Sequence, residues 1–186
     1  MTLQAVPDFA SVARDYAPHL QRYLLRQVGN EATANDLVQE TLLGISRGLA
    51  HFEGRASLKT WVFAIASRVA ADYLRRPERS RIIVDMDALL EIEDGETALD
   101  DRLEFDDMNQ CVREVIDSLP SDYRAALILH DLEDMDCAQT AAVLGISLGA
   151  ARVRIHRARA RLKVALQQQC GFYHDSESVL RCQRQR

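Results

Sequence analysis

The segment from Asp136 to Arg161 constrains the fold more than any other part of this chain. It reads DCAQTAAVLGISLGAARVRIHRARAR: a short apolar stretch, a glycine, and then a stretch rich in arginine. At helical spacing the first stretch has a packing face of small and apolar residues, Ala138, Ala141, Ala142 and Leu144. Gly145 can adopt the conformation that ends a helix, and Ser147 is a good N-cap for the next one. The pattern predicts a helix-turn-helix whose second helix turns five residues inward, namely Leu148, Ala151, Ile155, Ala158 and Leu162.

The outer face of that second helix is predicted to be strongly positive. Six cations and His156 occur between Arg152 and Lys163, with no acid among them. The arginines assigned to the outside are Arg152, Arg154, Arg157, Arg159 and Arg161. Arginine attracts phosphate by charge and can bond base edges through its guanidinium fork. A basic run alone is often only a solvated helix face, but joined to the turn signature it favours DNA binding.

Charge is segregated along the chain. The 186 residues fit two small domains better than one large one, and the formal net charge is only −5. The segment from Asp85 to Asp107 holds eleven acids and one base, Arg102, so the rest of the chain carries a net charge of +5. We therefore expect an acidic connector between two basic modules, a pattern that the average charge conceals.

Apolar spacing predicts an all-α fold. Before the connector, helices are expected at residues 9–28, 31–49 and 57–76, with Pro77 closing the third. After it, two more at 107–118 and 121–132 lead into the helix-turn-helix. The expected organisation is a helical domain at 1–80, an acidic linker at 81–106, a helix-turn-helix domain at 107–168 and an extension at 169–186.

Two surfaces of the N-terminal domain carry candidate binding residues. In the second helix, Asp36, Gln39 and Glu40 share an exposed side that could dock a basic partner, although such a strip is often just a solvated face. In the third helix, basic side chains alternate with aromatic ones, which suits unpaired DNA. There, Trp61, Ile65, Val69 and Leu74 are expected to pack inward, leaving Lys59, Arg68, Arg75 and Arg76 available.

Several classes of protein are disfavoured. The first residues do not resemble a signal peptide and no run is long enough to span a membrane, so we expect a cytoplasmic chain without membrane insertion. The four cysteines are not a disulfide framework, and Cys111 and Cys137 lie within helical patterns as expected packing residues. No phosphate-binding glycine loop, nucleophile elbow or metalloprotease helix is found, so neither catalysis nor a cofactor is expected.

The C-terminal extension CGFYHDSESVLRCQRQR is predicted to form a small hairpin around a polar turn at residues 175–178. Cys170 and Cys182 would lie at its two ends, with His174 between them. A zinc site, a reversible disulfide and a structural role with free thiols all remain open, and zinc lacks an obvious fourth ligand.

Taken together, these segments resemble the extracytoplasmic-function (ECF) sigma factors of bacterial RNA polymerase, from about Phe9 to Leu166. DLVQET is similar to the helix with which sigma region 2 grips the polymerase clamp. GRASLKTWVFAIASRVAADYLRR resembles the segment that melts the promoter and recognises the −10 element. LPSDYRAALILHDLEDMDCAQTAAVLGISLGAARVRIHRARARLK resembles region 4, which reads the −35 element. The order, the spacing and the acidic linker all agree.

The resemblance implies a role for individual residues. The residues implied in polymerase docking are Asp36, Leu37, Gln39, Glu40 and Thr41. The residues implied in opening the DNA strands at the −10 element are Lys59, Thr60, Trp61, Arg68 and Asp72. Arg75 and Arg76 are implied to contact backbone phosphate. The −35 element is approached by Ser147, Arg152, Val153, His156 and Arg157, with Arg154 and Arg159 as further phosphate contacts. The implied partners are core RNA polymerase, promoter DNA and an anti-sigma factor.

Departures from the family pattern concern specificity. Arg68 stands where many relatives have an asparagine that helps to capture a flipped −10 base, and Ala150 and Val153 replace residues that are often hydroxylic. Cys137 stands where an aromatic is common. The promoter sequence therefore does not follow by analogy. The alternative function is a free-standing helix-turn-helix regulator that binds duplex operators as a dimer.

Overall fold

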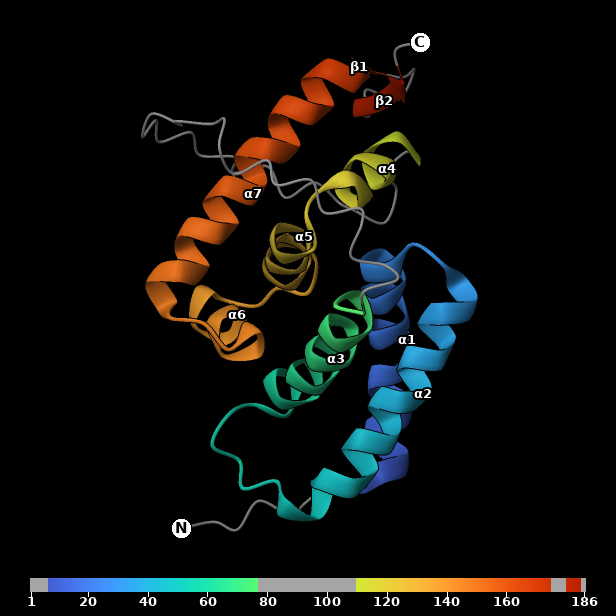
Figure 1. Cartoon of the computed structure of the whole chain (residues 1–186), viewed down its shortest axis with the longest axis vertical. Helices are drawn as coiled ribbons and strands as arrows, with labels where there is room; N and C mark the ends of the chain where they lie inside the picture. The colour runs from blue at the N-terminus through green and yellow to red at the C-terminus, as the bar shows by residue number, and fades with distance from the viewer. Residues whose placement is uncertain (1–6, 77–109, 175–179, 185–186) are drawn as a thin grey trace.

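The computed structural model describes residues 7–76, 110–174 and 180–184 (Figure 1). The whole acidic connector lies outside these ranges. Within them, no helix combines the length and the apolar character needed to cross a membrane.

Three α-helices form the N-terminal part: α1 (Phe9–Val28), α2 (Glu31–Gly48) and α3 (Leu58–Leu74), with a short 3₁₀ turn, η1 (Leu49–His51), after α2. Each lies within two residues of its predicted bounds because the local signals are strong. Asp8 caps α1 by accepting a hydrogen bond from the Ala10 amide at 2.8 Å, and Asn30 caps α2 through the Thr33 amide at 2.9 Å. Between the two, Gly29 takes the left-handed conformation, with φ of 67°.

Helices α2 and α3 pack closely because two glycines of α2 face α3. A Cβ atom at Gly44 would lie 2.9 Å from Cγ2 of Ile65, and one at Gly48 would lie 2.9 Å from the Trp61 ring. These glycines, four residues apart, hold α3 against α2 and so fix the position of its basic residues.

The C-terminal part contains α4 (Gln110–Ser118), α5 (Ser121–Leu127), a π-helical turn η4 (Ile128–Leu132), α6 (Cys137–Leu144) and the long α7 (Leu148–Gln169). The predicted helix at 121–132 is correct in extent, but its last five residues form the π-helical turn. The predicted start of α4 at 107 lies outside the described residues.

A two-stranded antiparallel hairpin follows α7, formed by β1 (Cys170–His174) and β2 (Leu180–Arg184). In its register Phe172 lies opposite Cys182, and Cys170 lies opposite Arg184. The hairpin was predicted from the sequence; its polar turn lies outside the described residues.

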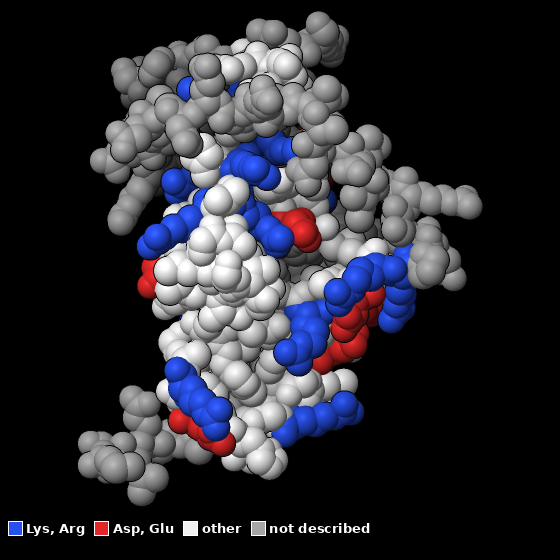
Figure 2. Space-filling view, turned by 60° about the vertical axis from the view of Figure 1, so that its left-hand side comes forward, with Lys and Arg blue, Asp and Glu red and all other residues white. Residues whose placement is uncertain are grey.

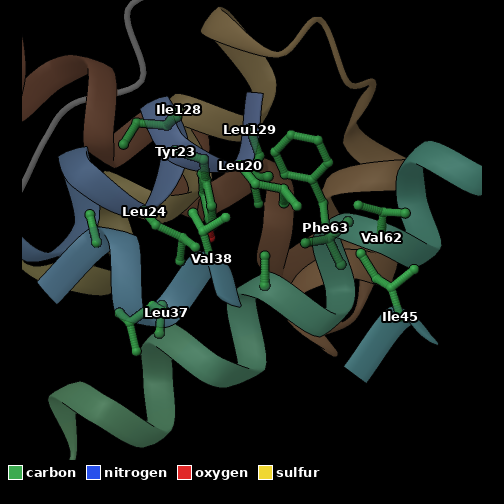
Figure 3. Close-up of a cluster of buried hydrophobic side chains, with 14 of the residues drawn as sticks. Leu20, Tyr23, Leu24, Leu37, Val38, Ile45, Val62, Phe63, Ile128 and Leu129 are labelled. Carbon is green, nitrogen blue, oxygen red and sulfur yellow. The ribbon is translucent and has the colours of Figure 1, made fainter. Parts of the chain in front are cut away.

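The two helical parts share one apolar core. Ile128 and Leu129 of η4 are fully buried in the same cluster as Leu20, Tyr23 and Phe63 (Figure 3). The Tyr23 and Phe63 rings meet edge to face at 5.5 Å, and the Tyr23 hydroxyl bonds the Ser67 hydroxyl at 2.7 Å. Val143 of α6 is buried in the same cluster, and α6 lies against α3, which places the first helix of the helix-turn-helix beside the basic helix of the N-terminal part (Figure 1). No pattern in the sequence indicated this packing.

Candidate nucleic-acid interface

The helix-turn-helix is built as its sequence predicts. Asp136 and Gln139 form a capping box at the start of α6, with side-chain to backbone distances of 2.7 and 2.9 Å. Gly145 ends α6 in the left-handed conformation, with φ of 65°. Ser147 then caps α7 by accepting a hydrogen bond from the Ala150 amide at 3.1 Å. These local bonds set the angle at which α7 leaves the turn.

The inward faces of α6 and α7 match the prediction in part. Four of the five apolar residues predicted for the inner side of α7 are buried: Ala151, Ile155, Ala158 and Leu162. The prediction that Leu148 is buried is wrong, since this residue is 40% exposed at the first position of α7. In α6 the buried residues are Thr140, Ala141 and Val143, whereas Ala138 and Ala142 are exposed. A helix of two turns has little periodic signal, so its neighbours α3 and α7 decide which face is buried.

A contiguous exposed surface remains on α7, and we call it the recognition surface. It consists of Arg152, Val153, His156 and Arg157, with Ser147 exposed just before the helix and Lys163 further along it. Figure 2, which brings the α7 side of Figure 1 forward, shows several lysine and arginine side chains close together in the upper half of the view, with others lower down. Cations, an imidazole and one apolar side chain on a single helix face can contact phosphates, base edges and thymine methyl groups.

Three of the five arginines predicted to face outward bind within the protein. Arg161 is buried, with its guanidinium 4.6 Å from the centre of the Tyr123 ring. Arg159 forms a two-pronged pair with Asp131, with Nε 3.1 Å from Oδ2, and this hydrogen bond raises the pKa of the arginine. Arg154 lies 3.5 Å from Asp122. The sequence prediction of Arg161 as an outward residue is therefore wrong, because α5 and η4 cover that side of α7.

The candidate −10 residues on α3 occupy three different environments. Arg68, Asp72, Arg75 and Arg76 are exposed, with Arg75 and Asp72 paired at 2.6 Å. Trp61 is half-buried, with its ring centre 5.2 Å from that of Phe52. Lys59 is half-buried and donates a hydrogen bond to the backbone carbonyl of Glu133 in the C-terminal part. These residues therefore differ in how far they are available to contact DNA.

Thr60 does not fit the direct role that the resemblance implied. It is 4% exposed, and its hydroxyl lies 2.8 Å from that of the N-cap Ser57. The core stripe of α3 is also displaced from the predicted one. Val62, Phe63, Ala66 and Ala70 are fully or nearly fully buried, whereas the predicted Trp61, Ile65, Val69 and Leu74 are half-buried at its edge. The helix is apolar on more than one side, so its periodicity alone did not locate the stripe.

The candidate docking residues on α2 include both exposed and buried side chains. Asp36, Gln39 and Glu40 are exposed, as predicted. Leu37 and Thr41 are buried, and the Thr41 hydroxyl donates to the Leu37 carbonyl at 2.7 Å. They can therefore support the strip but cannot touch a partner, which corrects the docking role implied for them. Sequence reasoning missed Leu43, which is 56% exposed and lies one turn beyond Gln39 and Glu40.

The backbone of the hairpin bears on the three possibilities for its cysteines. Cys170 and His174 are the two ends of one strand, so their Cα atoms are about 13 Å apart. A single zinc ion, bound at about 2.0–2.3 Å from each ligand atom, cannot join residues so far apart. Cys182 lies opposite Phe172 and only diagonally from Cys170, a separation of about 7–8 Å that a disulfide does not bridge without backbone movement. The register favours free thiols. The side chains of Cys111, Cys170, His174 and Cys182 lie outside the described residues, and Cys137 is a half-buried free thiol.

Comparison with known proteins identifies the family. Residues 12–80 match sigma-70 region 2, and residues 109–162 match sigma-70 region 4. The chain is 33% identical over 154 residues to the ECF RNA polymerase sigma factor EcfG of Rhodopseudomonas palustris, covering 80% of each protein. The chain belongs to the sigma-70 family, in its ECF group. This sigma factor is also 32% identical to CarQ of Myxococcus xanthus, covering 85% of this chain and 88% of CarQ.

Other relatives agree with this assignment. SigE of Mycolicibacterium smegmatis is 32% identical over 163 residues, although the chain spans only 62% of the length of that protein. Among solved structures, the sigma factor RpoE in its complex with the anti-sigma factor NepR from Bartonella quintana matches with a TM-score of 0.65 and 25% identity, covering 86% of this chain and 97% of RpoE. CnrH, solved with the cytosolic domain of CnrY, shares the fold with a TM-score of 0.60 at 23% identity. Sigma factors serve in transcription initiation, and that is the role of the family to which the chain belongs.

Proposed function

We propose that this sigma factor directs core RNA polymerase to promoters by contacting a −35 element with α7 and a −10 element with α3. The recognition surface supports this most directly. Arg152, Val153, His156 and Arg157 are exposed on one face of the second helix of a helix-turn-helix, which is the helix that enters the major groove in this motif. Arg154 and Arg159 become secondary, because each would have to leave an acidic partner to reach phosphate.

On the −10 side, we assign phosphate contacts to the exposed Arg68, Arg75 and Arg76. Trp61 lies at the edge of the α2–α3 core with part of its ring accessible, so it is the candidate for stacking on an unpaired base. Arg68 is longer and more basic than an amide, so the base preference near it should differ from that of relatives with asparagine.

The partners follow from the exposed residues and the relatives. Asp36, Gln39, Glu40 and the exposed Leu43 form a polar strip with one apolar centre, a surface that suits docking on core polymerase. RpoE and CnrH were each solved with a partner, the former with an anti-sigma factor, and we propose an anti-sigma factor for this chain too. Polymerase would supply the chemistry, so the sigma factor itself is proposed to be neither an enzyme nor in need of a cofactor, and to act in the cytoplasm.

We further propose that residues 1–80 act at the −10 element, 107–168 at the −35 element, and 81–106 as the linker between them. The test is run-off transcription from a randomised promoter library with core polymerase, with and without the protein, followed by sequencing of the transcripts. Protein-dependent starts that share two spaced elements would support the proposal. A folded protein that binds duplex DNA but yields no dependent transcripts would instead be an operator-binding regulator.

A further inference from the structure

We propose that Gly48 and Phe52 form a socket that fixes the orientation of the Trp61 ring, and that this orientation controls how readily the sigma factor opens promoter DNA. This inference rests on the proposed function, in which Trp61 is the candidate for stacking on an unpaired base. It adds two positioning residues, one at the end of α2 and one shortly after it, that no sequence pattern indicated.

Gly48 lies so close to the Trp61 ring that no side chain fits between them. A Cβ atom at Gly48 would lie 2.9 Å from Cζ2 and 3.5 Å from Cη2 of the ring, and beyond the adjoining chain it would meet no other described atom within 4 Å. The backbone does not require glycine at this position, since its torsion angles, φ −93° and ψ −16°, are right-handed helical. Glycine is also a poor helix former. What it provides here is room for the indole.

Phe52 forms the second wall of the socket. Its ring centre lies 5.2 Å from that of Trp61, with the planes tilted by 47°, a separation at which aromatic rings attract each other. The Phe52 amide donates a hydrogen bond to the Leu49 carbonyl at 3.1 Å, and the Leu49 side chain is buried in the core. Gly48 and Phe52 directly flank the 3₁₀ turn η1, so this anchored turn fixes the spacing between the two walls.

The backbone that carries Trp61 is fixed as well. Ser57 caps α3 by accepting a hydrogen bond from the Thr60 amide at 3.0 Å, and its carbonyl accepts one from the Trp61 amide, also at 3.0 Å. The ring therefore has little freedom to turn, yet the residue is only half-buried. A ring that is already held in one orientation loses less conformational entropy when a base stacks on it.

The test variant is Gly48→Ala, and Gly44→Ala is its matched control. Both substitutions place a Cβ 2.9 Å from a side chain of α3, but at Gly44 that side chain is Ile65. At Gly48 the overlap is with the outer edge of the indole, so rotation of Trp61 relieves it. Circular dichroism would show whether both variants fold, and thermal unfolding would measure how far each is strained.

The position of the ring can be followed directly, because Trp61 is the only tryptophan in the chain. In the free protein, Gly48→Ala should displace the ring from the socket towards solvent. Its emission should therefore move to longer wavelength and be quenched more strongly by acrylamide. Gly44→Ala should have the emission of the wild type, since it does not contact the ring.

Strand opening is measured with holoenzyme on a promoter selected from the randomised library, with 2-aminopurine in the −10 element. Gly48→Ala should lower the equilibrium constant for opening about 3- to 10-fold, whereas Gly44→Ala should stay within about 2-fold of the wild type. Binding to a duplex that carries only the −35 element should be equal for all three proteins. Equal opening by the two glycine variants, or unchanged emission in Gly48→Ala, would overturn the proposal.

A double-mutant cycle with Trp61→Phe separates the position of the ring from general packing. Phenylalanine keeps an aromatic ring but lacks Cζ2 and Cη2, so in that background Gly48→Ala should change opening by less than about 2-fold. A loss as large as in the wild type would contradict the socket.

If Gly48→Ala does not fold, Phe52→Leu takes its place, because it removes the other wall without placing a new atom against the indole. Phe52→Leu should lower opening and shift the Trp61 emission in the same directions. Opening and emission like those of the wild type would overturn the proposal.

Trp61→Ala distinguishes failure of the socket from failure of the proposed function. Loss of stacking on one base should lower the equilibrium constant for opening about 5-fold or more. If the wild-type holoenzyme opens no promoter, the sigma role fails, and if Trp61→Ala opens promoters normally, the stacking role fails; either result leaves the socket without a function. A defect in Trp61→Ala, with Gly48→Ala indistinguishable from Gly44→Ala, would refute the socket alone.

Discussion

At the scale of single residues, Tyr23 shows how burial fixes a protonation state. The side chain is fully buried between the two domains, and its hydroxyl bonds Ser67 at 2.7 Å. Burial raises the pKa of Tyr23 to about 12, and the nearby Glu133 carboxylate acts in the same direction. The folded protein therefore keeps this phenol neutral at pH values where an unfolded chain would ionise it.

The consequence is a loss of stability at high pH. The folded pKa lies above the unfolded value near 10, so the contribution is present below pH 10 and is lost as the pH rises towards 12. The difference between a pKa of about 12 in the folded protein and one near 10 in the unfolded chain corresponds to about 2.7 kcal/mol of unfolding free energy. Urea unfolding at pH 8, 10 and 11.5 should show a steeper fall for the wild type than for Tyr23→Phe, which cannot ionise. Parallel curves would contradict the assignment.

Replacement of two arginines of α7 by alanine should affect stability differently. Arg161→Ala loses a buried side chain and its contact with Tyr123, so thermal unfolding should show a loss of about 1–2 kcal/mol. Arg152→Ala changes an exposed residue and should leave stability unchanged within about 0.5 kcal/mol.

In transcription assays, Arg152→Ala should instead cost about 1–3 kcal/mol of discrimination at one −35 position. A uniform loss across all promoter variants would make Arg152 a phosphate contact. Lost stability in Arg152→Ala would place that side chain inside the fold, against the structure.

At the scale of elements, the contact between α2 and α3 can be tested with one substitution at two glycines. Alanine is the better helix former, yet Gly44→Ala places a Cβ 2.9 Å from the branched methyl of Ile65. Overpacking costs about 1–3 kcal/mol, which should outweigh the gain in helix propensity. We expect thermal unfolding to show a net loss of about 1 kcal/mol in stability. Gly149→Ala, on α7 with open space around it, should gain about 0.5 kcal/mol. The same sign at both sites would refute the close contact.

At the scale of the whole molecule, the shared core predicts cooperative unfolding. The buried cluster joins α1, α2 and α3 to η4, Met135 and α6, so neither domain can unfold without exposing part of the other. Scanning calorimetry of the free chain should show one transition with equal calorimetric and van't Hoff enthalpies. Two separated transitions in the wild type would contradict a shared core.

The sequence alone determined the helices, the helix-turn-helix and the family, because caps, glycine turns and apolar spacing are local and act within a few residues. The helix-turn-helix, for example, is predicted from the capping residues Asp136, Gly145 and Ser147, whose hydrogen bonds are all to residues nearby in the sequence. Only the tertiary structure decided which basic residues are available. Arg159 and Arg161 belong to the same basic run of α7 as Arg152, but residues of η4 and α5 bind them, and the Glu133 carbonyl binds Lys59 of α3. The packing of the two helical parts likewise joins residues about a hundred positions apart, such as His19 and Glu133, and helical periodicity carries no information about such distant partners.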